Sequence, residues 1–285
     1  MSNYLEKFVI EDKKLLKLCF IGKKNSFFSY ILMVKRMESI YMAFLLTTLA
    51  GLATMLGTIP IFIRLKQEHK MIAGSLAFAA GVMICVSITD LIPESIFMLR
   101  GYYSDLVVIF LAFLFLMIGI IVSSLVDKVL PVATLDMPLY KVGIISMLAI
   151  ILHNIPEGIA TFISTTKDTS LGISLALAIA LHNIPEGISI SVPIYYSTRS
   201  KGRSILYTFV SAMSEPLGAI VTYFFLFPFI NNIILGLLFA LIAGIMIQIS
   251  FVELLPASKS YSYSFITKLF FVVGVLIMLL KFVVC

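Results

Sequence analysis

The sequence predicts an all-α integral membrane protein with eight transmembrane helices, arranged as a 3+2+3 inverted-repeat bundle. Its composition excludes a soluble globular domain, because 60% of the 285 residues are hydrophobic and only 13% are charged. Eight apolar stretches each reach the length of about 20 residues that crosses a bilayer as a helix. Two internal repeats relate helices that run in opposite directions, and they indicate the inverted arrangement.

Short connectors containing Lys, Arg, Asp and Ser separate the apolar stretches. None of them is long enough to fold as a separate soluble domain, so we expect a single transmembrane domain over residues 41–285. The expected helices cover residues 41–63, 71–98, 106–126, 142–164, 171–195, 204–227, 233–257 and 265–284.

The basic residues indicate how this domain is oriented. Beyond residue 36, ten Lys and Arg follow the odd-numbered helices and three lie on the opposite side. By the positive-inside rule, both termini of this multi-pass protein of the cell membrane should be extracytoplasmic. The net charge of +6 and the pI of about 9.1 do not indicate a nucleic-acid partner, because no basic patch is interleaved with aromatic residues.

The first 40 residues do not fit this orientation. Residues 1–36 would add eight positive charges to the outer face, and they lack the clean apolar core and cleavage site of a signal peptide. We interpret residues 1–40 as a basic N-terminal tail, or as the product of a misassigned translation start whose true position is Met33 or Met37. Detection of a native peptide from residues 1–32 would exclude the second interpretation.

The stronger repeat is the hexapeptide His-Asn-Ile-Pro-Glu-Gly, which occurs at residues 153–158 and again at 182–187. These copies fall in the fourth and fifth helices, which run antiparallel as consecutive spans. A second repeat pairs residues 80–95 of the second helix with 243–258 of the seventh, and a fainter echo pairs 56–59 with 217–220. Both of these pairs are also antiparallel, so three helices are expected on each side of the middle two. Inverted repeats with a polar site at the midplane are typical of transporters.

The doubled motif places polar side chains at the centre of apolar helices, where a charge costs about 2.5 to 3.5 kcal/mol and usually marks a substrate or ion path. The His, Asn and Glu of each copy lie three or four residues apart, so they share one helix face. Glu215 adds a third carboxylate at the middle of the sixth helix. Nitrogen and oxygen donors without thiolate suit borderline divalent metals. The candidate metal ligands are His153, Asn154, Glu157, His182, Asn183, Glu186 and Glu215.

Prolines and outlying carboxylates complete the candidate path. Pro156 and Pro185 lack a backbone N–H, so we expect a bend and a free carbonyl at the level of the ligands. Asp90 and Glu94 lie outward of the centre and Glu253 lies inward, as entrance and exit relays would. Snorkelling or helix-end capping accounts for these three carboxylates equally well.

These residues resemble the ZIP (Zrt/Irt-like) family of divalent metal transporters, most closely its bacterial ZupT/GufA-like branch. The resemblance covers residues 41–285, and it rests on the paired His-Asn-x-Pro-Glu-Gly segments of neighbouring helices. It implies uptake of zinc, iron, manganese or cobalt into the cytoplasm through a binuclear midplane site, by elevator-like or rocking alternating access. The metal ions would be transported substrates, so neither a prosthetic cofactor nor an enzymatic activity is expected.

The same resemblance extends to individual positions. It assigns metal binding to the seven residues named above, and it matches Met83 to a position of the second helix that can add a thioether ligand. Residues 127–141 contain no histidine, whereas many relatives carry a His-rich loop there, so we expect no metal sensing by this loop. The expected partners are the metal substrate and the lipid bilayer, and a homodimer is one assembly open to such a protein.

Two rival interpretations belong to other classes. An intramembrane metalloenzyme would use a bound ion to activate water, but the sequence has no His-Glu-x-x-His motif and no convincing pair of nucleophile and base. A proton-coupled carrier of organic cations could use the same carboxylates, but the paired histidines and amides would then have no evident role. Stoichiometric metal binding, lost in His153→Ala, would separate the second rival from a metal transporter.

Overall fold

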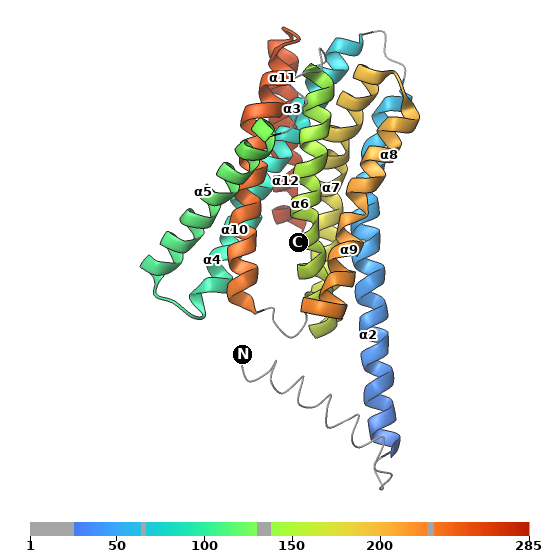
Figure 1. Cartoon of the computed structure of the whole chain (residues 1–285), viewed down its shortest axis with the longest axis vertical. Helices are drawn as coiled ribbons and strands as arrows, with labels where there is room; N and C mark the ends of the chain where they lie inside the picture. Colours follow the sequence, from blue (N-terminus) through green and yellow to red (C-terminus); the bar gives the residue numbers. More distant parts are fainter. Residues whose placement is uncertain (1–25, 64–66, 130–137, 227–230, 285) are drawn as a thin grey trace.

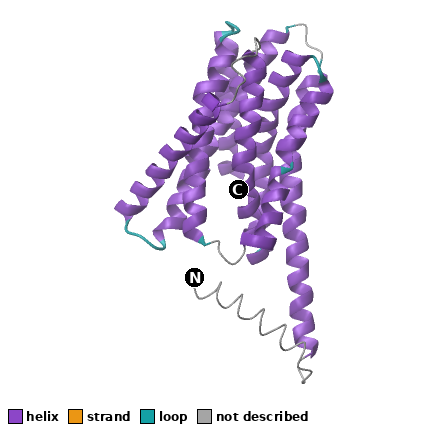
Figure 2. Ribbon diagram, viewed as in Figure 1, coloured by secondary structure: helices purple, strands orange, loops and turns teal. Residues whose placement is uncertain are grey.

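The computed structural model describes residues 26–63, 67–129, 138–226 and 231–284, and within them it is a bundle of long helices (Figures 1 and 2). Seven helical segments of this part are long and apolar enough to cross a membrane. An eighth apolar helix, α12 (Ser264–Val284), follows them. The predicted all-α membrane class is therefore confirmed, and the eight expected spans are all present as helices.

The spans fall into the predicted groups of three, two and three. The first group is α2 (Ser26–Ala53) with η1 (Thr54–Phe62), α3 (Glu68–Val86) with η2 (Ser87–Leu91) and α4 (Ile92–Arg100), and α5 (Asp105–Val129). The middle pair is α6 (Pro138–Lys167) and α7 (Thr169–Thr198). The last group is α8 (Lys201–Ala212) with α9 (Ser214–Val221) and η4 (Thr222–Leu226), α10 (Asn232–Ile249) with η5 (Ser250–Leu254) and α11 (Leu255–Lys259), and α12.

The first helix is the one whose observed start differs most from the expected one. It begins at Ser26, and the part that is apolar enough to cross a membrane is Met37–Phe62. Residues 1–25, which include most of the proposed basic tail, lie outside the described residues. The division of the chain at residue 40 therefore stays a prediction.

The second and seventh spans repeat one unusual local geometry. Each contains a π-helical turn, η2 or η5, directly before a proline-containing helix. Pro93 and Pro256 explain the wider turns, because a proline cannot donate to the carbonyl four residues back. A serine opens each turn and donates to the carbonyl four residues earlier, at 2.8 Å in both spans: Ser87 to Met83 and Ser250 to Met246. This agreement in detail confirms that the two spans are copies of one structural unit.

The middle pair packs against spans of both outer groups (Figure 1). Helices α2 and η1 pack against α6 and α7, and α9 packs against α6. On the other side, α12 lies along α3, and α5 lies along α10. The largest hydrophobic core cluster joins α3 and α10 to α7 and includes the fully buried Met83 and Met246. The helices that carry the doubled motif are thus held at the centre of the bundle.

Candidate metal site

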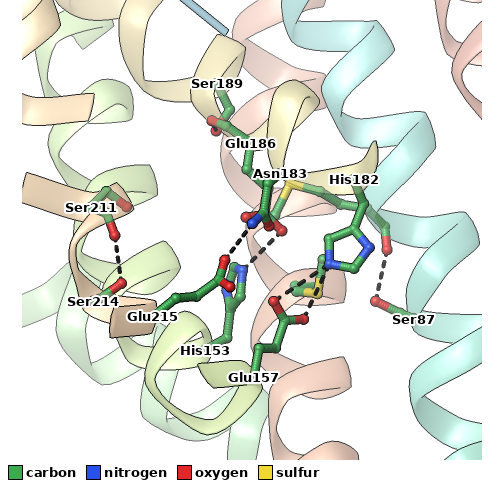
Figure 3. Close-up of polar contacts among 12 residues, drawn as sticks. Ser87, His153, Glu157, His182, Asn183, Glu186, Ser189, Ser211, Ser214 and Glu215 are labelled. Carbon is green, nitrogen blue, oxygen red and sulfur yellow. Dashed lines mark hydrogen bonds and ion pairs between the residues drawn. The ribbon is translucent and has the colours of Figure 1, made fainter. Parts of the chain in front are cut away.

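The two copies of the repeated motif face each other near the middle of the bundle. Helix α6 ends at Lys167 and α7 begins at Thr169, so Asp168 alone forms the turn that joins them. Because this turn is so short, residues at similar distances from it lie at similar depths on the two antiparallel helices. Residues 153–157 therefore lie level with residues 182–186, and their imidazoles and carboxylates point toward one another (Figure 3).

Each imidazole pairs with the carboxylate of the other motif copy. His153 Nε2 lies 2.9 Å from Oε1 of Glu186. His182 Nε2 lies 3.3 Å from Oε1 and 3.4 Å from Oε2 of Glu157. All four side chains are buried. These two contacts, which we call the crossed pairs, tie α6 to α7 at the level of the motif.

The prolines of the motif do not interrupt its helices. Pro156 lies inside α6 and Pro185 lies inside α7, and both helices continue beyond them. The interruption falls instead in the sixth span, at Met213 between α8 and α9. Pro216 explains this position, because its ring crowds the carbonyl four residues back, at Ala212, and cannot donate to it. The expected bends of α6 and α7 stay predictions.

This interruption positions Glu215. The residue lies in the first turn of α9 and is fully buried, and the positive end of the helix dipole favours its carboxylate there. The side-chain amide of Asn183 donates to Oε1 of Glu215 and also to the carbonyl of Ala50, the latter at 2.8 Å. Asn183 therefore links the second motif copy to both α2 and α9, and Figure 3 shows its contact with Glu215.

Glycines of the motif bring these elements into close contact. A Cβ added at Gly158 would overlap the carbonyl oxygen of Glu215, and one added at Gly187 would overlap the carbonyl oxygen of Thr54, both well inside the 3.0 Å that real Cβ atoms respect. Only glycine permits such an approach of two backbones. The last residue of each hexapeptide therefore seats a neighbouring span against the site.

The site carries more negative than positive groups. Three buried carboxylates, those of Glu157, Glu186 and Glu215, face the imidazoles of His153 and His182. With all three carboxylates ionised, the balance would be negative even with both imidazoles protonated. Because an uncompensated buried charge is strongly destabilising, this arrangement favours the binding of a cation.

Several oxygens of the site have no hydrogen-bond partner among the described residues. Buried polar atoms are normally paired, so unpaired ones call for a ligand or water. With the two imidazoles, these oxygens form a nitrogen and oxygen donor set of the kind that borderline divalent ions accept. They are Oδ1 of Asn154, Oδ1 of Asn183, Oε2 of Glu186 and Oε2 of Glu215.

The candidate ligands are paired with one another and are not arranged as a ready-made cluster. Within the described ranges, no group of three or more His, Cys, Asp and Glu side chains has a geometry that could hold a metal ion. If an ion binds at the motif, the crossed pairs would have to open, so that each imidazole and carboxylate exchanges its partner for the metal.

Comparison with known proteins decides the family. A family model described as ZIP zinc transporter matches residues 134–281 of the chain. The chain belongs to the ZIP family. It is 41% identical over 243 residues to the zinc transporter ZupT of Oceanobacillus iheyensis, covering 79% of this chain and 91% of that protein. It is 40% identical over 254 residues to ZupT of Streptococcus mutans, covering 85% and 96%, and 37% identical over 280 residues to ZupT of Campylobacter jejuni.

Membership of the ZIP family excludes the interpretation as an intramembrane metalloenzyme. The family is one of transporters, so this chain is a multi-pass membrane transporter and not an enzyme. The predicted resemblance is confirmed, and it was carried by the two motif copies that the structure brings together. The assignment of individual residues to the transported ion stays a proposal.

The remaining candidate residues, three carboxylates and one methionine, lie outside the cluster formed by the two motif copies and Glu215. Asp90 and Glu253 each lie fourth in their π-helical turn, so the internal symmetry relates them, and Glu253 is the more buried. Glu94 is exposed on α4. Met83 is fully buried in the hydrophobic core cluster that also holds Met246. Relay roles for the three carboxylates and a ligand role for Met83 stay predictions.

Two groups that contact or adjoin the site were not found by sequence reasoning. The first is the carbonyl of Ala50, which accepts from Asn183, and a backbone acceptor leaves no signal in a sequence. The second is Thr54, whose carbonyl meets Gly187. The register of the echo between residues 56–59 and 217–220 pairs Thr54 with Glu215 when it is extended two positions upstream, but these upstream residues do not match, so the sequence signal is weak.

Proposed function

We propose that this ZIP protein takes up divalent metal ions into the cytoplasm across the cell membrane, with zinc as the principal substrate. The observation that carries the proposal is the pair of crossed His–Glu contacts, buried between the two motif copies beside a third carboxylate. Its curated relatives are named as zinc transporters. Because nitrogen and oxygen donors do not select zinc strictly, iron, manganese and cobalt are the next candidates.

The donor set is sufficient for two ions. Each motif copy offers an imidazole, an amide oxygen and a carboxylate, and Glu215 adds a third carboxylate from α9. Carboxylates can bridge two cations and offset their mutual repulsion. We therefore favour a binuclear site, in which the crossed pairs open as the ions enter.

The grouping of helices supports alternating access. The site lies on α6, α7 and α9, with α2 and η1 packed against them. The helices α3, α5, α10 and α12 pack among themselves as a second group. Movement of one group past the other, by an elevator-like or rocking motion, would expose the ions to each side of the membrane in turn.

The orientation follows from charge. Among the described side chains after residue 36, seven Lys and Arg gather at the end of the bundle that carries the α7–α8 and α11–α12 connections. The opposite end holds Arg100 and Lys167. The positive-inside rule makes the first end cytoplasmic, so both termini are extracytoplasmic. The oligomeric state is a separate matter, and a homodimer of this protein stays a prediction.

The proposal is tested by uptake into proteoliposomes that contain the purified protein and a metal-sensitive dye. Zinc, iron, manganese and cobalt are offered in turn to the wild type and to the His153→Ala/His182→Ala variant. We expect zinc flux in the wild type and none in the variant. His69→Ala is the matched control, since His69 is exposed outside the motif, and it should keep wild-type flux.

Two outcomes would contradict this proposal. Flux that persists in the double variant would place the ion path elsewhere. Flux of an organic cation driven by a proton gradient, with no flux of any metal, would favour the organic cation carrier.

A further inference from the structure

Thr54 occupies, in the first half of the inverted repeat, the position that Glu215 occupies in the second half. The echo between Leu-Gly-Thr-Ile at 56–59 and Leu-Gly-Ala-Ile at 217–220 aligns the two residues when it is continued two residues upstream. The sequence alone gives this alignment little weight, because only a few residues match. The structure supplies independent support for it.

Backbone contacts repeat on the two sides of the middle pair. Gly158 of the first motif copy meets the carbonyl of Glu215, and Gly187 of the second copy meets the carbonyl of Thr54. These two glycines are the same residue of the hexapeptide. Both outer spans also change geometry here, since α2 gives way to η1 at Thr54 and α8 gives way to α9 beside Glu215. Thr54 is therefore the structural counterpart of Glu215.

The hydroxyl of Thr54 is unusual for this helix. Thr54 is fully buried, and its Oγ1 has no hydrogen-bond partner among the described residues. The two other buried threonines of the span each donate to a carbonyl of the same span, Thr47 to Ala43 at 2.8 Å and Thr58 to Met55 at 2.8 Å. The equivalent acceptor for Thr54 is the carbonyl of Ala50, which already receives the amide of Asn183. An unpaired buried hydroxyl calls for a ligand or water.

The motif asparagines show the matching difference. Asn183 uses its amide to hold Glu215 and the carbonyl of Ala50. In Asn154, its counterpart in the first copy, both the amide nitrogen and the oxygen lack a partner within the described part of the chain. The symmetry that relates Asn183 to Asn154 also relates Glu215 to Thr54. The first half therefore holds unpaired neutral groups where the second half holds an amide bonded to a carboxylate.

We propose that Thr54 is a further ion-binding residue of the transport site, where its hydroxyl, together with Asn154, forms a neutral counterpart to the acidic position made by Asn183 and Glu215. The inference rests on the proposed metal transport. A hydroxyl and an amide oxygen hold a divalent cation less tightly than a carboxylate does, so an ion that leaves Glu215 meets a weaker site at similar depth. Such an asymmetry prevents the ion from being trapped between two carboxylates.

The test compares Thr54→Val, Thr54→Ser and Thr54→Glu with the wild type, by zinc uptake into proteoliposomes and by zinc titration of the purified protein. Thr54→Val keeps the shape of the side chain and removes the oxygen, and we expect its KM for zinc to rise about tenfold, as for the loss of one polar contact. Thr54→Ser should match the wild type. Thr54→Glu restores the symmetric carboxylate, and it should lower both KM and the maximal rate.

A stability measurement separates a role in transport from a role in folding. Removing an unpaired buried hydroxyl should leave the melting temperature of Thr54→Val equal to or above that of the wild type. The matched control is Thr47→Val, at a buried threonine of the same span whose hydroxyl is already bonded, and its KM should not change. If the wild type neither binds nor carries zinc, both this inference and the proposed function fail. If the wild type carries zinc and Thr54→Val keeps its KM, this inference alone fails.

Discussion

The backbone of Gly158 lies directly against the backbone of Glu215, with no room between them for a side-chain carbon. This contact seats α9 on α6 and sets the position of the third carboxylate relative to the first motif copy. We predict that Gly158→Ala destabilises the protein by about 1–3 kcal/mol, the usual cost of forcing atoms into a packed interface. It should also abolish most zinc uptake, because α9 must move away. Thermal unfolding in detergent and proteoliposome flux measure the two effects.

Gly202→Ala is the control for this prediction. A Cβ at this helical position would meet nothing within 4 Å, and alanine favours a helix over glycine by up to about 1 kcal/mol. The control should therefore be as stable as the wild type or more so, with full uptake. Equal behaviour of the two variants would show that the close contact at Gly158 is not required.

The crossed pairs predict strong coupling between residues of different helices. His153→Ala and Glu186→Gln each remove one partner of a buried pair, so each should reduce zinc uptake by a large factor. The double variant should lose little more than either single one, because the second change removes a group that has already lost its partner. The measurement is a double-mutant cycle on uptake rates. Losses that multiply fully would show that the two residues act independently.

His69→Ala provides the control for that double-mutant cycle. It lies on α3 beyond the motif and its side chain is exposed. A cycle between His69→Ala and Glu186→Gln should show no coupling energy, since residues without shared partners usually contribute independently. Coupling of similar size in both cycles would mean that the first one reports a general loss of folding.

Much of this fold could be predicted from the sequence, because a bilayer restricts a spanning chain to long apolar helices. The span that contains residues 153–158 was expected over residues 142–164 and is observed as Pro138–Lys167. The extra residues at its ends are helical because a helix continues into the polar interface beyond its apolar centre. The first span was less well predicted, since α2 also includes residues 26–40, where Lys35, Arg36 and Glu38 interrupt a largely apolar stretch.

Other features depend on tertiary contacts that spacing alone does not specify. The spacing within one motif copy indicates that His153 and Glu157 share a helix face, and it suggests that they act together. In the structure each bonds to the other copy, to Glu186 and His182. This pairing between the two copies follows from the one-residue turn at Asp168, which fixes the relative depth of the two helices. The role of Ala50 was equally hidden, because it depends on where α2 crosses α7.

The turn at Asp168 itself gives a prediction about stability. Its carboxylate caps α7 by accepting from the backbone N–H of Ser170 at 2.8 Å and of Leu171 at 3.3 Å. Asp168→Ala should therefore cost about 1 kcal/mol, the usual value of an N-cap, and lower the melting temperature in detergent by a few degrees. Asp168→Ser keeps a capping oxygen and should restore most of the loss. A normal melting temperature in Asp168→Ala would show that the cap does not limit stability.

The orientation of the bundle predicts which connections react from which side. Ser104 and Ser260 are both exposed, and they lie in connections at opposite ends of the bundle. Each is changed to cysteine in a background without Cys19, Cys85 and Cys285, and whole cells are treated with a membrane-impermeant maleimide. If the end that carries most of the basic residues is cytoplasmic, Ser104→Cys reacts in intact cells and Ser260→Cys reacts only after the cells are opened. The reverse pattern would show that the bundle has the opposite orientation in the membrane. Ions that enter the site from outside the cell would then meet the Glu253 end of the bundle before the Asp90 end.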